Sequence, residues 1–182
     1  MIAIIAGVIW IAKRSKSTSA KPRLPQNTRD QNKSVSKTYV TREGQAMEAD
    51  DAFHAWTSGN LDEMVRALKT KTNLIDRHFL LMSIVDQAYK NRSDPDSADL
   101  LRKVAEMHVS EFPQIKPALK KEMDGILPRV TTFQKYATFL TDNKEYEKAL
   151  QICEQAISEG LHDGTKSGFE GRIKRIKRKT AV

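Results

Sequence analysis

Residues 130–163 read VTTFQKYATFLTDNKEYEKALQICEQAISEGLHD. Apolar side chains recur there at steps of three and four residues, on both sides of a polar break near Lys144. Such spacing places the apolar residues on one face of each of two helices. The stretch therefore predicts two amphipathic helices that pack against each other.

The same stretch resembles the tetratricopeptide repeat, a unit of about 34 residues. The positions that carry the resemblance alternate large with small side chains and are Phe133, Tyr136, Ala137, Leu140, Tyr146, Ala149, Cys153 and Ala156. Lys144 replaces a turn glycine that is common in the family, and Leu161 replaces its usual proline. The resemblance implies a concave surface that holds a peptide or protein segment. On it the first helix would present four polar residues, Thr131, Gln134, Thr138 and Thr141.

The remainder of a domain over residues 45–182 shows the same helical spacing. Helices are expected over residues 46–68 with a break at Gly59, over 74–89, over 95–112 with a stop at Pro113, and over 116–126. Residues 165–179 would form a terminal capping helix. No stretch shows the alternation with turn signals that is typical of strands. The predicted fold is all-α, a short solenoid of about three antiparallel helix pairs, because single pairs are rarely stable alone.

The net charge of +8 is concentrated at the two ends of the chain. Residues 13–44 carry +7, residues 45–163 carry −5 and residues 164–182 carry +6. The pI near 9.6 therefore describes the ends more than the centre. Basic ends suit anionic partners such as lipid headgroups or nucleic acid, and they also suit plain solvated tails.

Residues 1–12, MIAIIAGVIWIA, contain no charge, and the basic residues Lys13, Arg14 and Lys16 follow at once. This order is the reverse of a secretory signal and is typical of an amino-terminal anchor whose following domain stays in the cytoplasm. Twelve helical residues span about 18 Å, less than a bilayer core, so the segment could belong to a longer span or thin the bilayer. The alternative is an apolar end that packs on a soluble cytoplasmic domain. Residues 13–44 are polar and unperiodic, and we expect them to be a disordered linker.

The sequence offers little support for an enzyme. Cys153 lies on the apolar face of its helix, where a buried cysteine behaves as a small hydrophobic residue. The four histidines lack the spacing of a helical metal pair, and no phosphate-binding glycine loop or serine elbow occurs. We expect no catalytic residue, no cofactor and no metal. A hydrolase or redox enzyme using Cys153 is the weakest of three hypotheses.

At the basic carboxyl end, Ile173 and Ile176 should face inward. Four cations should project outward: Lys174, Arg175, Lys177 and Arg178. A capping helix requires such a polar outer face, whereas a nucleic-acid site would gain from stacking aromatic residues. The leading hypothesis is a non-enzymatic helical-repeat module for protein–protein interaction, tethered to the cytoplasmic face of a membrane. The alternative is a nucleic-acid-associated protein that binds through its basic ends.

Overall fold

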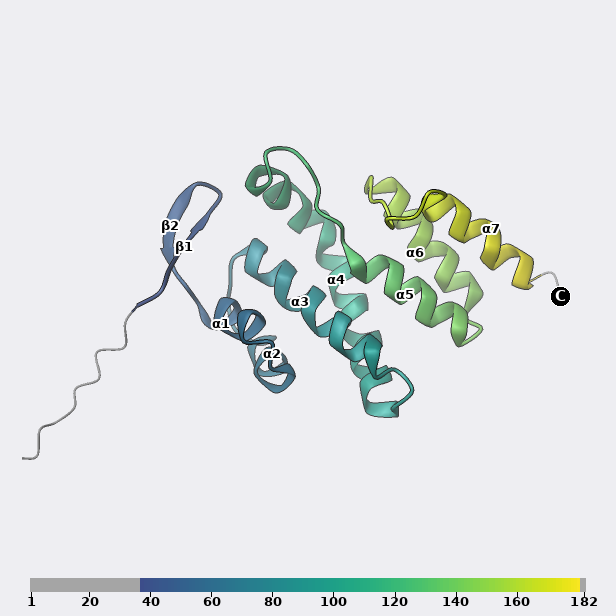
Figure 1. The fold of residues 1–182 in the computed structure, drawn as a ribbon, viewed down its shortest axis with the longest axis horizontal. Coiled ribbons are helices and arrows are strands. Elements are labelled where there is room, and N and C mark those ends of the chain that lie inside the picture. The colour runs from purple at the N-terminus through teal and green to yellow at the C-terminus, as the bar shows by residue number, and fades with distance from the viewer. Residues whose placement is uncertain (1–36, 181–182) are drawn as a thin grey trace, which may run out of the picture. The chain divides into compact units, whose positions relative to one another are not determined.

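The computed structural model describes residues 37–180, which form seven helices and one hairpin (Figure 1). The strands are β1 (Tyr39–Arg42) and β2 (Gln45–Glu48). The helices are α1 (Asp51–Ser58), α2 (Leu61–Ala67), α3 (Leu74–Lys90), α4 (Pro95–Glu122), α5 (Thr131–Asp142), α6 (Tyr146–Ser158) and α7 (Gly168–Thr180). The prediction of a mostly helical domain is confirmed.

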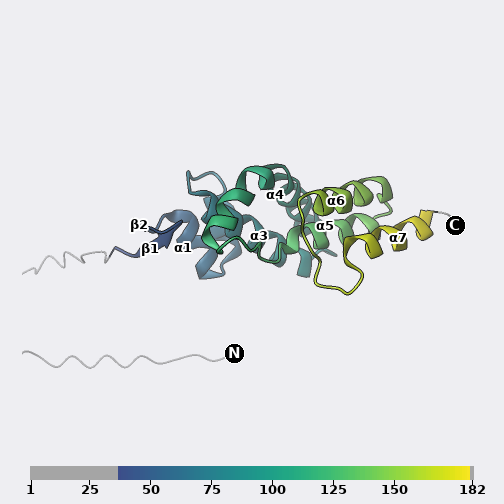
Figure 2. The same ribbon diagram turned by 90° about the horizontal axis from the view of Figure 1, so that it is seen from above.

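Helices that follow each other along the chain pack together. α1 contacts α2, α3 contacts α4, and α5 contacts α6, while α3 also contacts α1 and α5. Figure 2 shows α3, α5 and α7 in one row and α4 and α6 in a second row beside it. The core therefore lies between two rows of helices, and α7 follows α5 in the first row.

The hairpin is a correction to the expected boundary at residues 44 and 45. Residues 13–44 were expected to be disordered and the helical domain to begin at Gln45, but Tyr39 pairs with Glu48 and Arg42 with Gln45 in an antiparallel ladder. Glu43 and Gly44 between the strands have φ values of 50° and 81°, and this left-handed backbone suits a two-residue hairpin turn. The boundary thus falls inside the turn. Exposed and half-buried side chains alternate along β1. This alternation is hard to recognise in the sequence because the half-buried positions include the charged residue Arg42.

Arg42 holds the hairpin to the helices through the buried carboxylate of Asp76 at the start of α3. Its Nη2 and Nε lie 2.6 Å and 3.1 Å from the two Asp76 oxygens. Trp56 of α1 donates from Nε1 at 3.0 Å, and Asn73 donates from Nδ2 at 2.6 Å. Burial alone would raise the pKa of Asp76, but these hydrogen bonds outweigh burial and lower the pKa. The ionised carboxylate therefore joins β1, α1 and α3.

A second correction concerns α4, which continues through Pro113 to Glu122 instead of ending there. Of the separate helix expected over residues 116–126, residues 116–122 are the last part of α4 and residues 123–126 follow its end. Pro113 has no N–H to donate to the Val109 carbonyl four residues earlier, a loss that normally ends a helix. In the structure Gln155 of α6 donates from Nε2 to that carbonyl at 3.2 Å. Phe112 and Ile115, both fully buried, hold the helix on either side of the proline.

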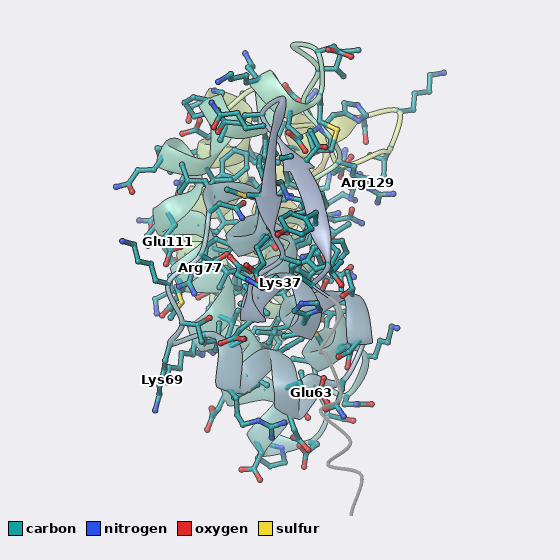
Figure 3. The ribbon with its side chains drawn as sticks, turned by 90° about the vertical axis from the view of Figure 1, so that its left-hand side faces the viewer. Lys37, Glu63, Lys69, Arg77, Glu111 and Arg129 are labelled. Atoms are coloured by element: carbon teal, nitrogen blue, oxygen red, sulfur yellow. The ribbon has the colours of Figure 1, made fainter. Side chains whose placement is uncertain are left out.

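An ion pair between α3 and α4 appears on the face seen in Figure 3, where Arg77 and Glu111 lie side by side. The Arg77 Nε and Nη2 each donate to one Glu111 oxygen at 2.8 Å. Arg77 also donates from Nη1 to the Leu68 carbonyl at 2.9 Å, at the carboxyl end of α2. One side chain therefore connects three helices.

Candidate binding groove between α5 and α7

The carboxyl-terminal helix α7 is fixed by its apolar side chains. Phe169 and Ile176 are buried and Ile173 packs against the same core, in agreement with the inward stripe expected from the sequence. These contacts are made mainly with α6. The docking of α7 leaves its polar side next to α5.

Arg172 connects α7 to α5 by a hydrogen bond. Its Nη1 donates to Thr138 Oγ1 at 2.7 Å, and its Nη2 lies 3.3 Å from the buried carboxylate of Asp163. Burial alone would raise the pKa of Asp163, but hydrogen bonds from Thr165 and the charge of Arg172 outweigh burial and lower it. The pair thus stays ionised and joins α7 to the segment before it, while the hydrogen bond to Thr138 joins α7 to α5.

A hollow of about 170 Å³ lies beside this link. Its lining combines two hydroxyls, one carboxylate, three cations and one apolar side chain, from Thr138, Thr141, Asp142, Arg172, Arg175, Ile176 and Lys179. Because Asp163 already neutralises Arg172, the two remaining cations, Arg175 and Lys179, face the single carboxylate of Asp142, and this positive excess attracts anionic groups. We call this hollow the α5–α7 groove.

The threonine hydroxyls of the groove donate their protons within α5. Thr138 donates to the Gln134 carbonyl at 2.8 Å and Thr141 to the Ala137 carbonyl at 2.7 Å. Since both protons are used within α5, a bound molecule can only donate to these oxygens, and at Thr138 it would share the oxygen with Arg172. The groove therefore offers acceptors on α5 and cationic donors on α7, a combination that matches a peptide backbone with acidic side chains.

The structure separates the four residues that the sequence placed on the partner-binding surface. Thr138 and Thr141 line the groove. Thr131 instead donates to Asp86 of α3 at 2.6 Å, and Gln134 accepts a hydrogen bond from Arg129 at 2.6 Å. Thr131 and Gln134 thus hold neighbouring segments of the domain, one turn or more from the groove.

All four predicted cations of α7 are exposed: Lys174, Arg175, Lys177 and Arg178. Only Arg175 also lines the groove. The predicted membrane contacts Lys13, Arg14 and Lys16, and the apolar residues 1–12, lie outside the described residues. Between residues 37 and 180 no helix combines the length and apolar character that crossing a bilayer requires.

Sequence reasoning missed Asp142 of α5 and two cations of the groove on α7, Arg172 and Lys179. Both cations share a helix face with Arg175, because the three follow each other at i, i+3 and i+7. This spacing was visible in the sequence. The partner helix of that face was not, because nothing local to residues 168–180 indicates that Thr138 lies opposite.

Cys153 and the histidines lie in the core. Cys153 is fully buried, and burial raises its pKa to about 12, which disfavours the reactive thiolate. His78 Nδ1 and His108 Nε2 are 2.9 Å apart, and His108 Nδ1 is 2.7 Å from Thr132 Oγ1. These contacts form one buried polar chain across α3, α4 and α5. Within residues 37–180 no three metal-ligating side chains gather in one place.

Comparison with known proteins leaves the family of this chain open. No protein-family model matches it, and no solved structure matches it significantly. It is similar to an uncharacterized protein of Aquifex aeolicus (strain VF5), with 26% identity over 115 residues. The matched part is 63% of this chain and 52% of that protein, so the chain spans about half the length of its relative.

Proposed function

We propose that this protein is a non-enzymatic helical-repeat module that binds a segment of another protein. The proposed architecture is a short stack of helix pairs of the tetratricopeptide type, made from α1/α2, α3/α4 and α5/α6 and closed by α7. The order of contacts along the chain and the two rows of helices in Figure 2 support this architecture. The module is proposed to be tethered by residues 1–12 to the cytoplasmic face of a membrane.

The observation that carries the binding role is the meeting of Thr138 and Thr141 with Arg175 and Lys179 in the α5–α7 groove. An extended acidic segment would donate backbone N–H groups to the threonine oxygens and place carboxylates against the two cations. Charged hydrogen bonds of this kind are roughly twice as strong as neutral ones. Partner choice would then depend on carboxylates spaced along the segment.

Binding of defined peptides to the full chain tests this role. We expect short acidic peptides to bind saturably, and the same peptides with Gln and Asn in place of Glu and Asp to bind at least tenfold more weakly. Arg175→Gln/Lys179→Gln should remove this preference.

The matched control is Lys174→Gln/Lys177→Gln, which removes the same charge from the outer side of α7 and should retain the preference. Equal loss of binding in both double variants would show an unspecific charge effect and contradict a role for the groove. Fluorescence anisotropy at two salt concentrations provides the measurement.

Association with nucleic acid is the second candidate, because the exposed cations of α7 could contact phosphates. Residues 171–180 contain neither an aromatic nor an amide side chain, so this surface lacks aromatic groups that stack on bases and amides that read adenine. Affinity for single- and double-stranded nucleic acid across a salt series tests the candidate. Submicromolar binding at physiological salt that is lost on changing Lys174, Arg175, Lys177 and Arg178 to Gln would favour it over the peptide-binding role.

A further inference from the structure

The cations of α7 occupy two separate sides of the helix. Arg172, Arg175 and Lys179 line the α5–α7 groove. Lys174, Lys177 and Arg178 are exposed and lie outside the groove lining, and we call these three residues the outer face. Their spacing of i, i+3 and i+4 places them together on one side of the helix. The outer face is therefore a basic surface that the groove does not use.

Within residues 37–180 the outer face has no ion-pair partner, although Arg172 on the same helix pairs with Asp163. Glu170, the acidic residue of α7, lies one turn before Lys174 but forms no ion pair with it, and Lys177 and Arg178 have no acidic residue within one turn of α7. The helix beneath them is held by buried Phe169 and Ile176. The charges are thus displayed on a fixed support.

We propose that the outer face binds the anionic lipid surface of the membrane to which the chain is tethered. Three closely spaced cations complement a layer of acidic headgroups, and each Lys or Arg near such a surface strengthens binding about fivefold. The apolar side of α7 is already buried in the domain, so the helix lies on the headgroups without inserting between acyl chains. The contact is therefore electrostatic and sensitive to salt.

This inference rests on the proposed tether. A membrane-bound amino terminus would keep the domain near the lipid surface and raise the effective concentration of the outer face there. The second contact would orient the domain, leaving the groove side of α7 accessible to an acidic segment. The lipid assignment is favoured over nucleic acid because the outer face contains only Lys and Arg, with no aromatic side chain on which bases could stack.

The test measures how close α7 comes to the bilayer in the full chain. A donor dye is attached at Thr180→Cys, an exposed position at the end of α7, in a Cys153→Ala background that leaves no other thiol. The acceptor is a headgroup-labelled lipid in vesicles of phosphatidylcholine alone or of phosphatidylcholine mixed with phosphatidylglycerol. We expect strong energy transfer only with the anionic vesicles, and its loss at high salt.

The substitution Lys174→Gln/Lys177→Gln/Arg178→Gln should lower energy transfer to the level of neutral vesicles. Lys69→Gln/Lys90→Gln/Lys103→Gln removes the same charge from exposed positions elsewhere in the domain and should leave the transfer unchanged. Equal transfer with both vesicle types, or equal effects of the two triple variants, would overturn the proposal. Tighter binding of the outer face to RNA or DNA than to anionic vesicles would also overturn it.

Flotation with the neutral vesicles reports the tether separately from the outer face. A chain that floats with both vesicle types but shows no anionic-specific transfer retains the tether and refutes the outer-face contact. A chain that floats only with anionic vesicles, with transfer that depends on the outer face, refutes the tether and retains the contact.

Discussion

His78 and His108 show how a single pair of residues makes the core dependent on pH. Their rings are fully buried and joined at 2.9 Å, and His78 Nε2 has no hydrogen-bond partner among the described residues. Burial lowers the pKa of His78 from 6.5 to about 4 and lowers that of His108 well below its ordinary value. Both rings are therefore neutral in the folded protein near pH 7.

We predict that acid destabilises the domain between pH 6.5 and pH 4. In this window the unfolded chain binds protons at His78 and the folded chain does not, so stability falls as the pH falls. The shift corresponds to about 3 kcal/mol for His78. Urea unfolding across the pH range should show this slope, and His78→Leu should reduce it. An unchanged slope in the variant would contradict the assignment, and the exposed His54 provides a control as His54→Leu.

At the scale of an element, α4 depends on a side chain from another helix. Pro113 deprives the Val109 carbonyl of its partner within α4, and Gln155 of α6 supplies one. A buried carbonyl without a partner costs free energy comparable to a lost hydrogen bond. Contact between α4 and α6 therefore helps the helix to continue beyond the proline.

A double-mutant cycle should reveal this dependence. Gln155→Ala should destabilise the domain by about 1 kcal/mol, because it leaves the Val109 carbonyl unpaired. In a Pro113→Ala background the residue at position 113 supplies the missing N–H, so the same change should cost much less. Chemical unfolding of the four proteins gives the coupling energy. A coupling near zero would show that Gln155 does not serve this carbonyl.

The helix pair α5/α6 gives a prediction about packing. Ala149 is fully buried between the two helices. Enlarging it in Ala149→Leu should overpack the pair and cost about 1–3 kcal/mol. Gln151→Leu adds an apolar side chain to an exposed position of the same helix and should change the denaturant concentration at the unfolding midpoint little. An equal midpoint for the wild type and Ala149→Leu would count against the small-residue packing on which the repeat resemblance depends.

The sequence was sufficient to predict the helices whose apolar residues recur at a clear helical spacing. It was insufficient for features that depend on a contact with a residue far away in the sequence. The apolar spacing in residues 130–163 predicted α5 and α6, and the stripe of Phe169, Ile173 and Ile176 predicted the docked side of α7. Where α4 passes through Pro113, the Val109 carbonyl accepts its hydrogen bond from Gln155, which lies 42 positions after the proline in the sequence. The hairpin depends on the bond from Arg42 to Asp76, and half of the groove depends on the position of α7 beside Thr138. The sequence pattern around each of these residues does not indicate its long-range partner.

At the scale of the whole molecule, three features lie along one chain: an apolar amino terminus, a helical domain and a basic carboxyl-terminal helix. Their proposed roles are connected. Under these proposals the tether would limit the domain to the membrane surface, the outer face of α7 would contact that surface, and the α5–α7 groove would receive an acidic segment. Because Arg175 and Lys174 are consecutive residues on different sides of α7, two anionic partners could be bound at once without sharing the same cations.

The tether itself gives the last prediction. Residues 1–12 contain no charge and precede three cations within the next four residues, so the full chain should sediment with membranes and resist extraction by high salt. Salt screens the contacts of exposed cations but leaves apolar insertion intact. Removing residues 1–12 should therefore convert the protein to one that salt releases completely, with the remaining binding due to Lys13, Arg14, Lys16 and the outer face. Fractionation of cells expressing either form, followed by washes at low and high salt, makes the measurement. Recovery of the intact protein in the supernatant before any wash would show that residues 1–12 are not an anchor.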